Sequence, residues 1–195
     1  MALNLAYEPG QTPLDADEVA QLIAKHIATQ GSLNEWEQLN IQRASKWTVR
    51  SKPTQVMSED FCRELHRRMF DKTWKWAGTF RKSDKNIGCD WRQVPTRLHQ
   101  LLGNAQYWIA EKVFPIDEIG ARFHHQLVLI HVFPNGNGRH ARMMTDCLLR
   151  HCGAKPFSWG SGSLIETSAL RNQYLAALRA ADAGDLKALL QFVRS

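Results

Sequence analysis

A histidine, a glycine-rich turn and two arginines lie close together in the segment from His131 to Arg142, which reads His-Val-Phe-Pro-Asn-Gly-Asn-Gly-Arg-His-Ala-Arg. Glycines allow positive φ angles, so successive N–H groups can converge on an anion, and the N-terminus of a following helix adds partial positive charge. Arg139 and Arg142 are three residues apart, share a helix face and can bind a polyphosphate through their guanidinium groups. The spacing therefore predicts a phosphate-binding site.

His131 stands at the other end of the same loop, and an imidazole is suited to general-base chemistry near neutral pH. Taken alone, Gly-Asn-Gly between helices is often only a tight turn, and a histidine at a helix end is often a cap. The segment is not a Walker loop, because no Gly-Lys-Ser/Thr follows, nor a dinucleotide fingerprint, because a helix rather than a strand precedes it. Histidine, turn and arginines together favour a functional site.

The elements that must position these residues are helices. Hydrophobic periodicity predicts helices over about residues 15–29, 32–49, from 58, after Pro95, over 116–130, from 139 to about 153, from a capping box at Ser163-x-x-Glu166, and a last short helix ending near residue 192. Glycines and a proline interrupt residues 77–95, which favours a short β-hairpin or flap. The sum is a single all-α domain with one small hairpin.

The composition narrows the partners of the 195-residue chain. A net charge of +6, with a pI near 9.3, favours nucleotides, nucleic acid or acidic proteins, but the basic residues are scattered. The four cysteines form no Cys-x-x-Cys pair, so reduced thiols are expected. The sequence has neither a secretory signal nor an apolar run long enough for a bilayer, which favours a cytoplasmic protein with no membrane partner.

The segment from residue 131 to 142 resembles the motif of the Fic family, His-x-Phe-x-Asp/Glu-Gly-Asn-Gly-Arg-x-x-Arg, at every defined position except Asn135. Trp76-Ala-Gly-Thr-Phe-Arg81 is similar to the start of the Fic flap, and Tyr174 to Asp185 to the family's C-terminal helices. Taken whole, the chain resembles the Fic subgroup called mobile mystery protein B. The resemblance implies the Fic fold over residues 58–195, preceded by a helical extension over residues 1–57 that packs on it.

Fic proteins usually move AMP from ATP to a Ser, Thr or Tyr hydroxyl of a target protein, so the resemblance implies a protein nucleotidyltransferase. His131 would take the hydroxyl proton, and Arg139 and Arg142 would hold the β- and γ-phosphates. The remaining implied nucleotide contacts are Gly136, Asn137 and Gly138 at the α-phosphate, and Tyr174 in the nucleoside pocket or, alternatively, in the core. The flap would pair with the target as an added strand through Thr79, Phe80, Arg81, Asn86, Ile87 and Gly88.

Asn135 departs from the family, in which an Asp or Glu at this position binds the Mg²⁺ that bridges the phosphates. Mg²⁺ favours carboxylate oxygens, and an amide oxygen lacks their charge. We therefore expect Mg²⁺ as the cofactor of the nucleotide, with Asn135 weakening its binding and slowing AMP transfer without abolishing nucleotide binding. A different donor, such as GTP or another phosphate ester, is the alternative.

Two further groups of residues have an ordinary and a functional interpretation. Many Fic proteins are restrained by a glutamate that pairs with the second arginine of the motif; Glu35 and Glu37 are candidates, although neither fits the usual pattern and both can be solvated helix residues. Four histidines invite a metal interpretation, but no carboxylate or cysteine completes a tetrahedral set, so no transition metal is expected. These histidines are His124, His125, His131 and His140.

Two other classes of function stay open at this point. A nucleotide-binding regulator that has lost catalysis is favoured by Asn135, and a basic helical nucleic-acid-binding module is favoured by the charge alone. The expected partners are ATP or another nucleotide and a target protein that docks on the flap. The subgroup resemblance also implies a DNA-binding partner protein, whereas direct nucleic-acid binding by this chain is not expected.

Overall fold

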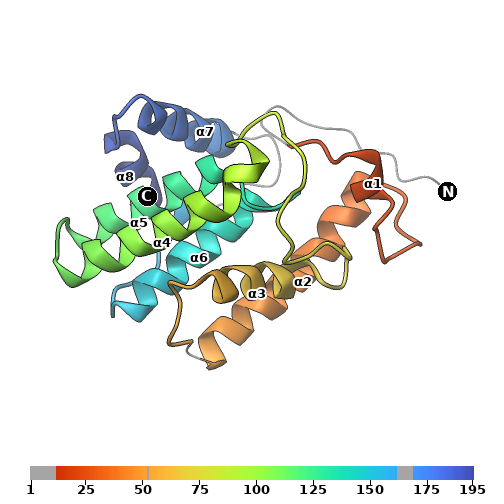
Figure 1. Ribbon diagram of the computed structural model, residues 1–195, viewed down its shortest axis with the longest axis horizontal. Helices are drawn as coiled ribbons and strands as arrows, with labels where there is room; N and C mark the ends of the chain where they lie inside the picture. The colour runs from red at the N-terminus through yellow and green to blue at the C-terminus, as the bar shows by residue number, and fades with distance from the viewer. Residues whose placement is uncertain (1–11, 52, 162–168) are drawn as a thin grey trace.

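The computed structural model describes residues 12–51, 53–161 and 169–195, and these residues form the expected all-α domain (Figure 1). Its helices are α1 Ala16–Val19, α2 Gln30–Ser51, α3 Glu59–Phe70, α4 Val94–Ala110, α5 Ile116–Ile130, α6 Asn137–His151, α7 Ala169–Asp182 and α8 Lys187–Arg194. Two 3₁₀ turns, η1 Trp91–Gln93 and η2 Trp159–Ser161, connect them. The capping box expected at Ser163 lies outside the described residues.

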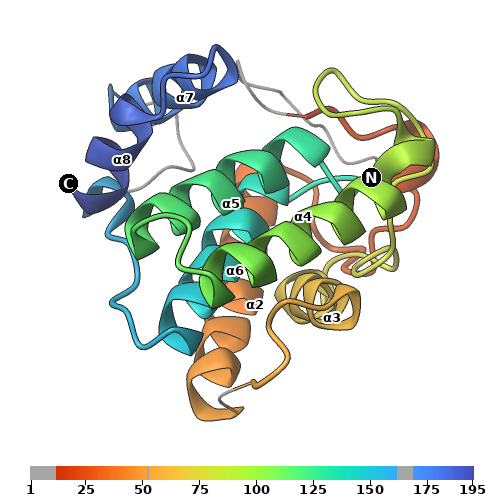
Figure 2. The ribbon, with the colours of Figure 1, turned by 60° about the vertical axis from the view of Figure 1, so that its left-hand side comes forward.

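Helix α5 lies in the middle of the domain, packed between α4 and α6 (Figures 1 and 2). The residues that its periodicity predicts to face inward are all buried: Ile119, Phe123, Leu127 and Ile130. Helices α2 and α3 pack together, and α3 contacts α6. Helices α7 and α8 also pack together, and α8 contacts α5. The central helix pair α5–α6 is thus held on both sides, which fixes the loop that joins the two helices.

The helix expected over residues 15–29 is wrong for most of its length. Helix α1 ends at Val19, and the chain then runs as turns and bends to residue 29. The backbone of residues 21–23 instead pairs with the segment after α3: Ile23 N donates to Thr73 O at 2.8 Å, and Lys75 N donates to Gln21 O at 3.1 Å. Tertiary hydrogen bonds that burial makes obligatory have overridden a weak helical preference here. The predicted domain boundary at residue 58 stays a prediction.

The β-hairpin expected over residues 77–95 is also wrong. All of these residues are described, and they form turns, bends, η1 and the start of α4, with no strand. This flap, residues 77–90, lies beside the N-terminal segment in the ribbon (Figure 1). Its carbonyl groups bind an arginine side chain rather than a second strand, as described below, and this removes the acceptors that a hairpin ladder needs.

The structure also shows the state of the four cysteines and the length and polarity of the described helices. Cys62, Cys89, Cys147 and Cys152 form no disulfide. Burial raises the pKa of the Cys62 thiol, and it raises the pKa of the Cys147 thiol to about 11, so both stay protonated at neutral pH. No described helix is both long and apolar enough to cross a bilayer.

Candidate active site

The loop between α5 and α6 begins and ends in the left-handed conformation. His131, at the C-terminus of α5, has φ 55°, and Gly136, at the N-terminus of α6, has φ 77°. A Cβ atom on Gly136 would lie 2.5 Å from the ring of Phe70, so both the backbone angle and the available space require glycine. This reversal brings His131 and the first turn of α6 to the same cavity.

The side chain of Asn137 holds the loop closed from inside. Its Oδ1 accepts from Phe133 N at 2.9 Å, and its Nδ2 donates to Phe133 O at 2.7 Å. Asn137 can therefore contribute only its backbone N–H to an anion. The first N–H groups of a helix have no acceptor within it. Residues 136–138 line the cavity, but Gly136 N is bonded to Asn135 Oδ1, so the N–H groups of residues 137 and 138 are the ones that can bind an anion.

His66 supports the same loop from α3. Its Nδ1 accepts from Gly78 N at 2.9 Å, so Nε2 carries the proton and donates to Asn135 O at 3.1 Å. Its ring stacks on Phe133, with the centroids 3.7 Å apart. Burial lowers the pKa of His66 well below its usual value, which keeps the ring neutral in this arrangement.

Arg81 fastens the flap to the loop from a buried position. Its side chain is fully enclosed, and its guanidinium donates to the carbonyls of His131 (2.6 Å), Ser83 (2.8 Å), Ile130 (3.3 Å) and Cys89. The resemblance implies that Arg81 belongs to the target-binding flap; its buried side chain has no access to a target, and pairing of the flap with a target stays a prediction. The contacts of the Arg81 side chain give it a structural role instead.

We expect the substitution Arg81→Lys to lower the free energy of unfolding by roughly 2–4 kcal/mol, because a lysine cannot span these carbonyls and leaves buried acceptors unpaired. Urea unfolding measures this change. The exposed Arg97→Lys is the matched control and should stay within about 0.5 kcal/mol of the wild type. An Arg81→Lys protein as stable as the control would contradict the clamp.

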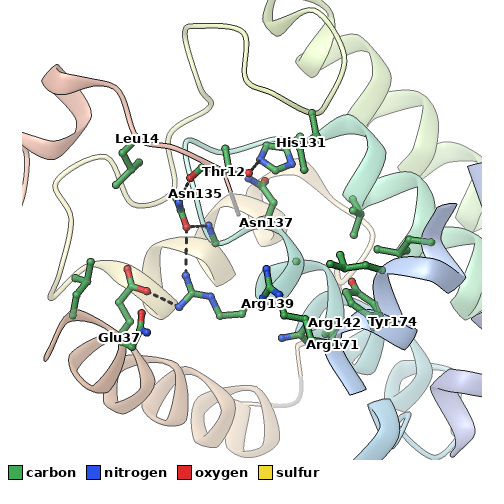
Figure 3. Close-up of a pocket in the computed structure, with 18 of the residues that line it drawn as sticks. Thr12, Leu14, Glu37, His131, Asn135, Asn137, Arg139, Arg142, Arg171 and Tyr174 are labelled. Atoms are coloured by element: carbon green, nitrogen blue, oxygen red, sulfur yellow. Dashed lines mark hydrogen bonds and ion pairs between the residues drawn. The ribbon is translucent and has the colours of Figure 1, made fainter. Parts of the chain in front are cut away.

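The imidazole of His131 lies inside the cavity, only 4% exposed, with Nε2 3.1 Å from the hydroxyl of Thr12 (Figure 3). Burial, followed by the positive charges of Arg81 and Lys85, lowers the pKa of His131 to about 4. The ring is therefore neutral at pH 7. The 3.1 Å from Nε2 to the hydroxyl is within the reach of a general base, in the tautomer that carries its proton on Nδ1.

Asn135 is engaged on both sides of its amide. Its Oδ1 accepts from Gly136 N at 2.6 Å and lies 3.5 Å from Arg139 Nη2, and its Nδ2 donates to Thr12 O at 2.9 Å. An oxygen that already accepts an N–H and lies beside a guanidinium does not fit a Mg²⁺ ligand. Among the described residues, no cluster of three His, Cys, Asp or Glu side chains could hold a metal. The side chains of this site do not fit a protein-held Mg²⁺.

Glu37 of α2 reaches the cavity, and Glu35 does not. Glu37 Oε2 pairs with Arg139 Nη1 at 2.5 Å, and its Oε1 accepts from Trp74 Nε1 at 2.7 Å. The expected pairing with the second arginine is thus corrected to the first. Glu35 is exposed on the outer side of α2 and lines no part of the cavity, which agrees with a solvated helix residue. Glu37 occupies the guanidinium that the sequence assigned to a phosphate.

Arg142 and Tyr174 close the far end of the cavity. The guanidinium carbon of Arg142 lies 5.7 Å from the centre of the Tyr174 ring, and the Tyr174 hydroxyl lies 2.9 Å from His124 Nε2. Burial lowers the pKa of His124 to about 3 and raises that of Tyr174, so both are neutral at pH 7. Tyr174 is both buried and a lining residue, so the two interpretations of it hold together.

The cavity, of about 210 Å³, also contains residues that the sequence did not single out. Thr12 enters it from the N-terminal segment, and α7 contributes Arg171, Leu175 and Leu178 beside Tyr174. Arg171 and Leu178 stand three and four positions from Tyr174, so helical spacing from Tyr174 could have found them, whereas Leu175, one position away, does not follow from that spacing. Thr12 carries no such signal.

The flap residues divide by position. Ile87 lines the cavity and is 44% exposed, whereas Phe80 packs towards Phe133, with ring centroids 6.1 Å apart. Thr79, Asn86 and Gly88 are exposed. The flap thus offers an exposed edge near the cavity, although not as a strand.

The candidate metal histidines have separate partners. His124 bonds to Tyr174 and His125 to Asp182, while His131 faces Thr12 and His140 donates to Cys62 O. Each therefore takes part in a different interaction.

Comparison with known proteins gives a family match over residues 56–149, to the Fic/DOC family. The chain is 29% identical over 134 residues to protein adenylyltransferase Fic of Aedes aegypti, covering 67% of this chain and 26% of that protein. It is 30% identical over 147 residues to protein adenylyltransferase fic-1 of Caenorhabditis elegans, covering 73% and 28%. The chain thus spans about a quarter of the length of these curated relatives.

Solved structures show the same fold. The N-terminal FIC domain of Bep8 from Bartonella sp. 1-1C superposes with a TM-score of 0.70 at 13% identity, covering 88% of this chain and 89% of that one. BepC of Bartonella tribocorum with bound AMPPNP superposes with a TM-score of 0.68 at 18% identity, covering 88% and 89%. At these identities the likeness concerns the fold alone.

The family match contains the whole loop from His131 to Arg142, together with α5 and all but the last two residues of α6, which hold it. The resemblance to mobile mystery protein B is a finer statement, which these relatives do not test, and it stays a prediction. Sequence match and fold agree on the broader assignment, and the chain belongs to the Fic/DOC family through the Fic domain that it carries.

Proposed function

We propose that this protein binds a nucleoside triphosphate at the N-terminus of α6 and transfers its nucleotidyl group, with AMP as the first candidate, to a protein hydroxyl. One observation carries the proposal: Nε2 of the neutral His131 ring lies 3.1 Å from a hydroxyl, in the cavity that also holds the α6 N-terminus, Arg139 and Arg142. A base, an acceptor position and an anion site thus lie in one place. The curated relatives named protein adenylyltransferases support the same class.

In the proposed reaction, the acceptor oxygen attacks the α-phosphorus, its proton passes to His131 Nε2, and the bond to the leaving pyrophosphate breaks. The N–H groups of residues 137 and 138 stabilise the charge that develops on the α-phosphate, since Gly136 N is bonded to Asn135 Oδ1. Arg139 and Arg142 hold the β- and γ-phosphates. Arg139 must first leave Glu37, so Glu37 competes with the nucleotide for this guanidinium.

The target protein would dock over the exposed edge of the flap, close to Ile87, which lines the cavity from outside. From there a target hydroxyl would reach His131 once the Thr12 hydroxyl, 3.1 Å from Nε2, has moved aside. The DNA-binding partner stays a sequence prediction.

A second candidate, a nucleotide-binding regulator without transfer activity, is favoured by Asn135 and by the Glu37–Arg139 pair. Labelled nucleotide separates the two. Incubation of the chain with cell lysate, Mg²⁺ and ATP or GTP labelled at the α-phosphate should label protein if the first holds. Nucleotide binding without any protein label would favour the second, and a lack of binding would reject both.

The Asn135→Asp substitution should make the affinity for ATP depend more strongly on Mg²⁺. A carboxylate supplies the charge that the amide lacks, and it removes the donor to Thr12 O. The quantity to compare is the ratio of the ATP affinity with Mg²⁺ to the ATP affinity without it. We expect this ratio to be about tenfold larger for the Asn135→Asp protein than for the wild type. Isothermal titration with and without Mg²⁺ measures this ratio. The same ratio in both proteins would contradict the interpretation of Asn135.

A further inference from the structure

We propose that Thr12 of this chain is itself a modification site, at which the enzyme attaches a nucleotidyl group to its own N-terminal segment. The inference rests on the proposed function and names a substrate of that same site. The substrate class is a threonine hydroxyl held within the molecule.

The position of the Thr12 hydroxyl is that of an acceptor. Its Oγ1 lies 3.1 Å from His131 Nε2, and the residue is 8% exposed, so the hydroxyl is enclosed with the base (Figure 3). A general base must lie within about 2.6–3.2 Å of the group whose proton it takes, and this pair does. Burial lowers the pKa of His131, so the ring is neutral at pH 7, and in the tautomer with its proton on Nδ1 the free Nε2 faces the Thr12 hydroxyl.

The segment that carries Thr12 is fastened at several points. We call residues 12–18 the N-terminal strap. Its first residue is held through the Thr12 carbonyl, which accepts from Asn135 Nδ2 at 2.9 Å. At its other end, Lys85 Nζ of the flap pairs with Asp15 (2.8 Å) and Glu18 (2.6 Å). These contacts hold the strap, and with it Thr12, at the cavity.

The ion pair between Lys85 and Glu18 is largely buried. The Lys85 side chain is only 2% exposed and that of Glu18 is 12% exposed, and an ion pair in such surroundings is screened by salt far less than a surface pair. Ser83 Oγ adds a hydrogen bond to Asp15 at 2.6 Å. A hydroxyl held in one orientation beside its base reacts as an intramolecular group, which favours it over a diffusing target.

The donor site lies on the other side of the hydroxyl. Figure 3 shows Thr12 and His131 at one end of the cavity and Arg142, Arg171 and Tyr174 at the other, with Arg139 between them. A nucleotide whose phosphates lie at the α6 N-terminus would present its α-phosphorus to the His131 end. Thr12 Oγ then forms a bond to phosphorus, its proton goes to His131 Nε2, and pyrophosphate carries away the electrons of the broken bond.

The test is self-labelling of the full chain. Purified protein is incubated with Mg²⁺ and ATP or GTP labelled at the α-phosphate, without lysate, and the modified residue is mapped by peptide mass spectrometry. The label should appear at Thr12 at a rate per molecule that does not change on dilution. Thr12→Val should lower self-labelling about tenfold or more, and Thr12→Ser, which keeps the hydroxyl, should retain most of it.

Controls separate this proposal from the proposed function. Thr96→Val removes an exposed hydroxyl of α4 outside the cavity and should leave self-labelling unchanged. A parallel reaction with lysate shows whether the chain is active at all. Labelled lysate proteins with no label at Thr12, or equal self-labelling by Thr12→Val, would overturn the Thr12 assignment alone. No label on any protein would overturn it together with the proposed function.

Discussion

Replacing His131 with alanine should lower the rate of nucleotidyl transfer by about 10²–10⁴-fold, the contribution usual for a positioned general base. The imidazole is the base that faces the acceptor position, with Nε2 3.1 Å from the Thr12 hydroxyl. The anion site is built from other parts, namely the α6 N-terminus and Arg142, so nucleotide affinity should change little. Initial rates of label transfer and a separate nucleotide titration measure the two quantities.

The matched control is His125→Ala, which removes a histidine of the same helix that pairs with Asp182 and lies outside the cavity. It should transfer label at the wild-type rate. Transfer by the His131→Ala protein at that same rate would remove His131 from the reaction. Loss of nucleotide binding in parallel with loss of transfer would instead place His131 in the binding site.

Acidification should destabilise the folded chain steeply between pH 6.5 and pH 4. Burial lowers the pKa of four histidines: His66 well below its usual value, His124 to about 3, and His131 and His140 to about 4. A group with a depressed folded-state pKa contributes stability above its unfolded pKa, near 6.5 for histidine. That contribution is lost as the pH falls towards the folded-state pKa, because the unfolded chain takes up the proton first.

One carboxylate opposes this trend. Burial raises the pKa of Asp146 to about 6, so between about pH 6 and pH 4 the folded state holds a proton there that the unfolded state releases. Near pH 5 the unfolded chain binds about four more protons than the folded chain at the histidines and about one fewer at Asp146, a net difference of about three protons. At 1.36 kcal/mol per proton and pH unit, the free energy of unfolding should fall by roughly 4 kcal/mol per pH unit there.

Urea unfolding at a series of pH values between 7.5 and 4.5 measures the slope. His140→Gln, whose amide can still donate to Cys62 O, should reduce the slope by about one proton, or roughly 1.4 kcal/mol per pH unit. His99 is exposed on α4, and His99→Gln should leave the slope unchanged. A free energy of unfolding that is flat from pH 7 to pH 5 would contradict the neutral, buried state of these histidines.

The central helices and the loop could be predicted from the sequence because each depends on local information. The apolar spacing of α5 is explicit, and the Gly-Asn-Gly turn requires the backbone angle that Gly136 adopts. The loop then joins His131 to the arginines without reference to any distant residue. The structure therefore has α5 and the turn at Gly136 as the sequence predicts them.

The remainder depends on contacts between distant parts of the chain. Residues 20–29 lose their expected helix to hydrogen bonds with residues 73–75, and the flap loses its hairpin to the buried guanidinium of Arg81. Thr12 meets His131 across an interval of 119 residues. Glu37 could be named as a candidate, but its choice of Arg139 depends on how α2 packs, which no pattern in α2 reveals.

The most direct test of the central claim is a crystal structure of the chain with a non-hydrolysable nucleoside triphosphate. We predict phosphate density against the N–H groups of residues 137 and 138, between Arg139 and Arg142, with Glu37 detached from Arg139. Density for the nucleotide elsewhere, for instance in the groove of α4 that Arg92 and Arg97 line, with the Glu37–Arg139 pair intact, would contradict it.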